Sequence, residues 1–227
     1  MVCLTVGVVV LSGAWKCAVQ PPSGRMGLRR ILAEPFGYRF FSSIVGSDSA
    51  TRRVFDQYLP ELASKSILDV GCGPRGLVAY LPKSARYVGI DSSRKYCDSA
   101  RRLNQSRGEF VCAQAECLPD SIGKFDVIIA SGLLHHLSDQ SGRAFLGQMS
   151  QFLQKDGVLL TLDGVWTANQ SMLARLLLRC DRGQHVRTLK QYVELAEHPI
   201  KCSGSWVLDD LLRIPYTHAI LKFKIDA

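Results

Sequence analysis

Apolar residues recur along this chain in short runs that alternate with segments of helical spacing. Residues 66–70 form one such run and lead directly into glycines, which predicts a buried strand followed by a turn. Further strands are expected at 87–91, 109–112, 125–130 and 157–162. Apolar strands with little alternation are covered on both faces, so the pattern predicts an α/β fold with a parallel, doubly wound sheet.

The segments between these strands have helical spacing. Helices are expected at 94–104, where Ser92 or Ser93 can cap the first turn, and at 142–153. A run from 52 to 63 contains Pro60, so a helix there should end near the proline. Shorter or later elements are expected as helices at 77–81, 171–178 and 188–196, and as strands at 206–208 and 217–225.

The N-terminal part has a different character. Residues 2–15 are apolar but too few for an ordinary membrane span, and no basic segment precedes them as in a secretory signal. We expect 1–25 to be a weakly ordered extension and 26–64 a helical cap, with no stable membrane insertion. A secretory signal or a short anchor is the alternative for 1–25. Residues 65–227 should form the main domain.

The chain has 227 residues, 47% of them hydrophobic, which suits one domain of ordinary globular composition. The formal net charge of +8 allows a nucleic-acid or anionic partner. The positive residues are scattered and form no run of five, so a solvated basic surface is the preferred interpretation and no nucleic-acid partner is expected.

Cysteine usage bears on metal binding and compartment. The eight cysteines include no C-x-x-C pair, so no metal site is expected. Several lie in apolar stretches, where cysteine behaves as a small hydrophobic residue. Free thiols in a reducing cytoplasm fit this usage better than a disulfide framework.

The strongest chemical signal is the glycine-rich loop at 71–76, which reads G-C-G-P-R-G. Small residues let the backbone turn sharply after a strand and approach a ligand closely. The spacing alone also fits a dinucleotide site. Asp69, two residues before the loop, would repel a pyrophosphate but suits an amino-acid head group. Asp91 ends the second strand, where a carboxylate can accept both hydroxyls of a ribose.

Five motifs in order resemble those of class I S-adenosylmethionine-dependent methyltransferases. They lie at 67–74, 88–93, 113–119, 125–137 and 153–159. The resemblance covers about residues 65–165. Within the family, the sequence resembles the small-molecule group that includes the quinone methyltransferases. It implies a Rossmann-like, mostly parallel sheet with an antiparallel C-terminal strand. It also implies a cofactor half at 65–165, substrate-side elements at 166–227 and S-adenosylmethionine as cofactor.

The same resemblance implies roles for individual residues. Asp69, Gly71 and Gly73 would hold the methionine end, and Asp91 the ribose. The full predicted cofactor set is Asp69, Gly71, Cys72, Gly73, Asp91, Ser92, Gln114, Ala115 and Ser131. Two positions depart from the family. Arg75 stands where glycine is usual, with Gly76 as a possible compensation, and Gln114 stands where aspartate is common. Both departures should leave cofactor binding intact.

Methyl transfer needs a base only if the acceptor must lose a proton. His135, His136 and Asp163 are the candidates, since a histidine near its ordinary pKa can serve at neutral pH. Each has a structural alternative: packing for the histidines, and a cap or turn for Asp163.

A polar stretch follows the fifth expected strand. Arg182 and Arg187 could hold an anionic part of a substrate, and Tyr192 could line its pocket. The alternatives are an exposed Asp181–Arg182 ion pair and plain core packing of the tyrosine. Core packing is also the preferred interpretation for Tyr216 and His218.

The predicted function is methyl transfer from S-adenosylmethionine to a small-molecule or lipid-like acceptor by in-line displacement. The stretch after the fourth strand lacks the Asn/Asp-Pro-Pro-Tyr pattern of nucleobase amine methylation. The alternatives are a nucleotide-dependent oxidoreductase, an RNA methyltransferase supported only by the charge, and a non-catalytic partner subunit. The acceptor and the oligomeric state are not predicted.

Overall fold

The computed structural model describes residues 46–59, 61–104, 106–181 and 183–226. The predicted N-terminal extension, the first part of the helical cap and Arg182 lie outside these ranges. Within them, no helix has the length and the apolar run that crossing a bilayer requires.

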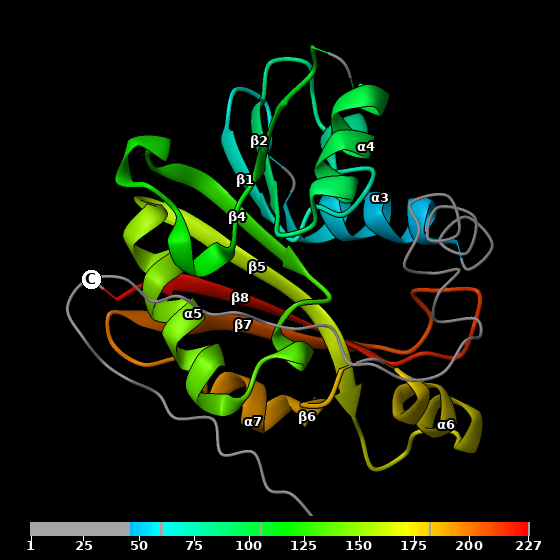
Figure 1. Cartoon of the computed structure of the whole chain (residues 1–227). Coiled ribbons are helices and arrows are strands. Elements are labelled where there is room, and N and C mark those ends of the chain that lie inside the picture. The colour runs from blue at the N-terminus through cyan, green and yellow to red at the C-terminus, as the bar shows by residue number, and fades with distance from the viewer. Residues whose placement is uncertain (1–45, 60, 105, 182, 227) are drawn as a thin grey trace, which may run out of the picture.

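A single sheet with the path order β3-β2-β1-β4-β5-β8-β7 runs through the molecule (Figure 1). The strands are β1 (Ser66–Val70), β2 (Arg86–Asp91), β3 (Glu109–Cys112), β4 (Phe125–Ser131), β5 (Leu153–Trp166), β6 (Arg187–Thr188), β7 (Ile200–Leu208) and β8 (His218–Ile225). Strands β1 to β5 pair in parallel. Strand β8 is antiparallel to β5 and to β7, so the predicted mostly parallel sheet with an antiparallel C-terminal strand is confirmed.

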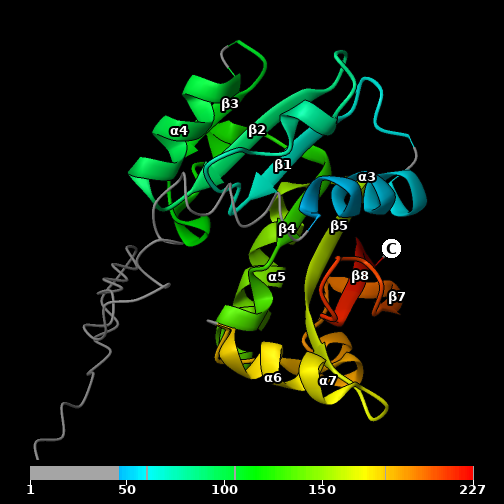
Figure 2. The ribbon, with the colours of Figure 1, turned by 90° about the vertical axis from the view of Figure 1, so that its right-hand side faces the viewer.

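Helices cover both faces of this sheet (Figure 2). They are α3 (Ser47–Tyr58), α4 (Arg94–Asn104), α5 (Asp139–Phe152), α6 (Met172–Cys180) and α7 (Leu189–Val193). Alternate residues of β1 serve the two faces: Leu68 packs with the buried face of α5, and Ile67 with that of α3. Buried apolar side chains on both faces are the main stabilising contribution, and they explain why the strands lack polar alternation.

Local sequence signals set most helix limits. Helix α3 ends before Pro60, as predicted, and Ser93 Oγ accepts the Tyr96 N–H at the start of α4. Ser138 caps α5 in the same way. These are the side-chain acceptors that the unpaired N–H groups of a first turn require.

Two predicted helices were wrong in extent. The expected helix at 77–81 is a single 3-10 turn, η1 (Val78–Tyr80). The expected helix at 188–196 shrinks to α7. Thr188 forms the N-terminal capping box with Gln191, and after Val193 the backbone continues in short turns, in which the Leu195 and Ala196 N–H groups donate to the carbonyls of Tyr192 and Val193.

Strand β5 is longer than predicted and changes the place of Asp163. Its pairing with β4 ends at Leu162, but the strand continues to Trp166 beside β8. Asp163 therefore lies inside β5, one residue beyond the end of β4, instead of at the end of its own strand.

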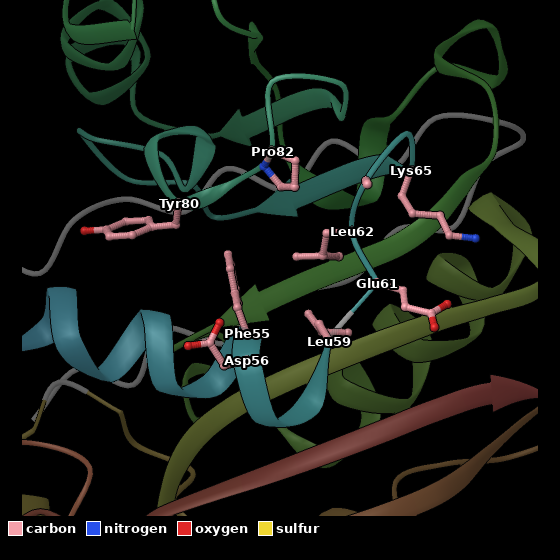
Figure 3. A pocket seen from close by; sticks show the side chains of 9 residues that line it. Phe55, Asp56, Leu59, Glu61, Leu62, Lys65, Tyr80 and Pro82 are labelled. Carbon is pink, nitrogen blue, oxygen red and sulfur yellow. The ribbon is translucent and has the colours of Figure 1, made fainter.

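A hollow lies between α3, η1 and the start of β1 (Figure 3). Its lining mixes apolar side chains such as Phe55 and Leu62 with Asp56, Glu61 and Lys65 at the rim. Because ligands of open parallel sheets bind outside the carboxyl ends of the strands, this hollow is not the expected site.

Candidate active site

The loop after β1 is shaped by glycines in the left-handed region. Gly71, Gly73 and Gly76 have φ of 76°, 63° and 64°. A Cβ added at Gly71 or Gly73 would meet nothing within 4 Å, whereas one at Gly76 would lie 2.7 Å from the hydroxyl of Tyr87. Gly76 is therefore needed for packing, and the first two glycines leave the backbone open to a ligand.

Asp91 fixes this loop from the carboxyl end of β2. Its Oδ2 accepts the Gly73 N–H at 3.0 Å, and its Oδ1 accepts the Ser93 N–H at 2.8 Å. Burial raises the pKa of Asp91, and the two backbone N–H groups oppose that rise. Each carboxylate oxygen retains a second lone pair, so the group can still accept hydroxyls of a ligand.

Asp69 lies deeper than the sequence suggested. It is 2% exposed, and its Oδ2 accepts the Tyr87 hydroxyl at 2.6 Å. Burial raises the pKa of Asp69 to about 7, against the lowering effect of the Tyr87 hydrogen bond. Its predicted contact with the methionine end stays a prediction, and the structure shows a carboxyl group engaged beneath the loop.

Tyr87 was missed by sequence reasoning, yet a signal for it existed. Gly89 lies opposite Asp69 in the β1–β2 pairing, and a Cβ there would come within 2.9 Å of the Tyr87 hydroxyl. A glycine inside a strand often marks a close approach. Here Gly89 and Gly76 leave room for the hydroxyl that holds Asp69.

The remaining predicted cofactor residues lie at the carboxyl ends of the strands. Cys72 is buried in the loop, and burial raises the pKa of its thiol. Ser92 is exposed just after β2, and Ser131 is exposed at the end of β4. Gln114 and Ala115 are partly buried at the start of the turn η2 (Ala115–Cys117) after β3. The fold thus brings the predicted set together at the carboxyl ends of strands β1 to β4.

Arg75 has a clear structural role. Its guanidinium donates to Asp48 of α3 at 2.9 Å and to the Tyr80 hydroxyl at 2.9 Å, and Tyr80 also donates to Asp48. The side chain thus ties the loop to α3. This accounts for the departure from the family glycine.

His135 occupies a buried polar cluster near the carboxyl end of β4, beside β5. It lies in η4 (Leu134–His136), and Asp163 Oδ1 accepts its backbone N–H at 3.1 Å and faces its Nδ1 at 2.8 Å. On the other side, His135 Nε2 lies 3.4 Å from Asp181 Oδ1. The Tyr216 hydroxyl donates to Asp181 Oδ2 at 2.7 Å.

Charge in this cluster argues against His135 as a general base. Burial alone lowers the pKa of His135, but the hydrogen bonds and charges of Asp163 and Asp181 outweigh it and raise the pKa to about 9. An imidazole already protonated at neutral pH cannot accept another proton. His136 is exposed beside it, with the ring centroids 4.2 Å apart, and stays the predicted base candidate.

The predicted substrate residues Arg187 and Tyr192 are buried. Arg187 is 5% exposed and donates to the carbonyls of Leu134 and Leu137 and to Asp139. Tyr192 is fully buried, and its hydroxyl donates to the Gly164 carbonyl. Their substrate contacts stay untested. The geometry instead favours positioning of the turn that carries His135.

Asp181 and Tyr216 lie in the cluster around His135. From the sequence, Asp181 could belong equally to a substrate-side polar cluster or to an exposed ion pair, and core packing was preferred for Tyr216. Their partners lie far away in the chain, 35 residues apart for this pair, so spacing carried no signal of the contact. His218 lies in the same region, its ring beside that of Tyr216, and burial lowers its pKa to about 4.

Comparison with known proteins agrees with this fold. Residues 67–157 match the family model described as "Methyltransferase domain". A phthiotriol/phenolphthiotriol dimycocerosates methyltransferase of Mycobacterium ulcerans (strain Agy99) is 36% identical over 112 residues, which are 45% of this chain and 39% of that protein. The present chain thus aligns with well under half the length of this relative.

Solved structures match over more of the chain. Mitomycin 7-O-methyltransferase superposes with a TM-score of 0.67 at 18% identity, covering 88% of this chain and 61% of that one. N-methyltransferase NodS of Bradyrhizobium japonicum, solved with S-adenosyl-L-homocysteine, gives 0.66 at 16% identity, covering 88% and 97%. Residues 67–157 thus match a methyltransferase domain, and these likenesses show that the chain has the Rossmann-like fold of such methyltransferases.

Proposed function

We propose that this protein transfers a methyl group from S-adenosylmethionine to a small-molecule or lipid-like acceptor. One observation carries the cofactor assignment. The loop after β1 presents two left-handed glycines with open space above them, next to a carboxylate at the end of β2. The family match of residues 67–157 supports this cofactor over a dinucleotide.

The residues at this edge fit the cofactor. Gly71 and Gly73 allow close approach of the backbone, and Asp91 offers acceptor lone pairs for ribose hydroxyls. Gln114 and Ala115 would meet the adenine, and Ser131 the methionine end. When bound, the cofactor supplies a methyl group already activated on a sulfonium.

The chain's own contribution would then be positioning and exclusion of water, with proton removal where the acceptor requires it. Asp163 and Asp181 fix His135, and Arg187 fixes the turn around it, which holds this wall of the site rigid. The exposed His136 is the side chain that would take a proton from an alcohol or a carbon acid.

An acceptor with an apolar part is supported by α6, which ends next to Asp181. Met172, Leu173 and Leu176 are 89%, 54% and 56% exposed on this helix. The M. ulcerans relative is itself, by name, a methyltransferase of phthiotriol dimycocerosates. We propose the cytoplasm as the compartment, which the free cysteines among the described residues support, and no nucleic-acid partner.

The test combines binding with transfer. Isothermal titration should show binding of S-adenosylmethionine and no comparable binding of NADH. Purified protein incubated with methyl-labelled S-adenosylmethionine should then label members of a panel of phenols, quinols, amines and lipids. Tight binding of NADH without S-adenosylmethionine binding would identify an oxidoreductase instead. Cofactor binding without methyl transfer to any panel member or to RNA would point to a non-catalytic subunit. Methyl transfer to RNA alone would identify an RNA methyltransferase instead.

A further inference from the structure

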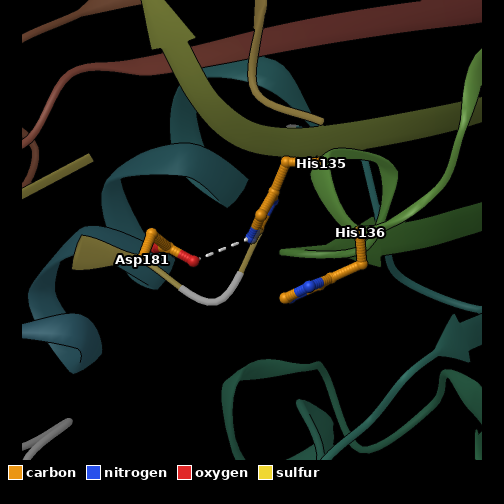
Figure 4. A group of neighbouring side chains, drawn as sticks. All are labelled: His135, His136 and Asp181. Carbon is orange, nitrogen blue, oxygen red and sulfur yellow. Dashed lines mark ion pairs between the residues drawn. The ribbon is translucent and has the colours of Figure 1, made fainter. Parts of the chain in front are cut away.

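We propose that His135, His136 and Asp181 form a binding site for a divalent transition-metal ion such as Zn²⁺. Each side chain offers one ligand atom, and the three atoms lie within 4.8 Å of one another (Figure 4). The site does not use the predicted cofactor residues, but it includes His136, the proposed base. A His136 that binds an ion cannot also take a proton from the acceptor, so Zn²⁺ binding and methyl transfer are measured separately.

The spacing of the ligand atoms fits a tetrahedral ion. His135 Nε2 and Asp181 Oδ1 are 3.4 Å apart. This exceeds the length of about 2.7–2.9 Å that is usual for a charge-assisted hydrogen bond. Two ligand atoms each about 2.1 Å from a tetrahedral Zn²⁺ are separated by about 3.4 Å. The gap between imidazole and carboxylate thus has the width that an ion would need.

The ligand types favour zinc and its neighbours in the transition series. Two imidazoles and one carboxylate suit Zn²⁺, Co²⁺ or Ni²⁺, whereas Mg²⁺ and Ca²⁺ prefer oxygen ligands alone. Three protein ligands leave a fourth position for water or another oxygen donor. His136 is exposed, and the Asp181 side chain is 26% exposed, so an ion can reach the site from solvent.

The surrounding groups hold the ligands as metal sites usually require. Asp163 Oδ1 binds the far nitrogen of His135 at 2.8 Å, which leaves Nε2 directed towards Asp181. Metal-ligating histidines commonly donate their other ring N–H to a carboxylate. Asp181 is oriented too, by the Tyr216 hydroxyl at 2.7 Å and the Gly183 N–H at 2.9 Å.

The charge of the cluster also favours an ion. Asp163 and Asp181 place two carboxyl groups against the two nitrogens of one imidazole. A divalent ion that displaces the Nε2 proton to solvent balances both carboxylates, with His135 and His136 as neutral ligands. The alternative is a metal-free imidazolium between two carboxylates, and the experiment below separates the two.

The test measures metal binding by the full-length protein after treatment with a chelator and its removal. Titration with Zn²⁺ should show one site, and Co²⁺ should give the absorption of a tetrahedral complex without thiolate bands. His136→Ala changes an exposed side chain and should weaken Zn²⁺ binding at least about tenfold. Asp181→Asn should do the same, with thermal unfolding measured to confirm that the variant is folded.

Two matched controls exclude the other ligands of the chain. His198→Ala removes an exposed histidine outside the cluster, and Cys180→Ser removes the thiol next to Asp181. Both variants should bind Zn²⁺ as the wild type does. The proposal is overturned if the wild type binds no Zn²⁺ at micromolar concentration, if His136→Ala binds it unchanged, or if Cys180→Ser abolishes binding.

Discussion

Two regions at the carboxyl ends of the strands, the loop after β1 and the cluster around His135, are built in different ways. The loop after β1 is a continuous segment whose glycines and following carboxylate lie within about 20 residues, and its shape follows from local backbone requirements. The cluster between β4 and β5 instead joins His135, Asp163, Asp181 and Tyr216 from four separate segments. The loop depends on the conformation of its backbone, and the cluster depends on long-range charge pairing. Substitutions should therefore affect the two regions differently.

The largest effect on stability should come from the cluster. Asp163→Ala removes a fully buried partner of His135 and leaves the buried Nδ1 and backbone N–H of His135 without this acceptor. Breaking a buried pair by removing one partner costs about 3–5 kcal/mol, so the free energy of unfolding should fall by about that amount. Urea denaturation measures this directly.

The matched control is an exposed pair. Lys190 and Glu194 are both more than half exposed, so Glu194→Ala should change the free energy of unfolding by less than about 0.5 kcal/mol. Equal effects of the two substitutions would contradict the buried network described for His135.

Asp69 beneath the loop should give the next largest effect, through pH. Its pKa is raised to about 7, chiefly by burial, so between about pH 4 and 7 the folded state keeps a proton that the unfolded state has lost. The free energy of unfolding should therefore decrease as pH rises through this window, by up to about 1.4 kcal/mol per unit.

The Asp69→Asn variant isolates this contribution, since Asn does not titrate. The difference in unfolding free energy between wild type and variant should shift in favour of the variant from pH 4 to 7 and level off above. The other groups around Asp69 are Tyr87, Cys72 and Asp91, and they remain in both proteins. A difference that is constant with pH would show that Asp69 titrates at its ordinary value.

Asp91 should affect cofactor binding more than stability. Asp91→Asn removes the charge that would accept ribose hydroxyls, and hydrogen bonds to charged groups contribute about 1.5–3 kcal/mol, so affinity for S-adenosylmethionine should fall at least about tenfold. Asp126→Asn is the control, because Asp126 also holds backbone, at Ser66, but at the opposite end of the sheet. It should leave the affinity unchanged. Parallel losses in both variants would indicate a general effect on folding.

The smallest effect is expected at Arg75. Its side chain contacts α3 instead of the open face of the loop, so Arg75→Gly should leave affinity for S-adenosylmethionine equal or better. Stability should fall by about 1 kcal/mol, from a partly exposed ion pair and added backbone freedom. Asp48→Ala removes the same ion pair without changing the loop backbone. A large affinity loss confined to Arg75→Gly would assign Arg75 to the cofactor site.

The contrast between the loop and the cluster also explains which parts of the fold and of the site could be predicted from the sequence. Strands β1 to β5, helices α4 and α5, and the glycine loop depend on local pattern, and the prediction found them. The end of β5 was missed because Asp163 interrupts an apolar run, although β8 pairs with it and continues the strand. The burial of Asp69 was missed because it depends on Tyr87 from the neighbouring strand.

The burial of Asp69 also changes which residues support the cofactor assignment. From sequence, Asp69 was the residue that excluded a pyrophosphate by its charge. In the structure this carboxyl is buried under the Tyr87 hydroxyl with a raised pKa, so its charge bears less on the open face of the loop. The assignment now depends on the open glycines, on Asp91 and on the likeness to known methyltransferases.

The most direct test compares a glycine of the loop after β1 with a glycine of positive φ far from that loop. Gly71 and Gly123 both have positive φ, and an added Cβ meets nothing within 4 Å at either. Gly123 has a ψ of −169°, in a region that is essentially restricted to glycine, so alanine there should cost at least as much stability as alanine at Gly71, about 1–3 kcal/mol. Titration with S-adenosylmethionine should show binding by the wild type and Gly123→Ala, and at least about tenfold weaker binding by Gly71→Ala, a difference of about 1.4 kcal/mol. Equal affinity in all three proteins, or none in the wild type, would contradict a cofactor site at this loop.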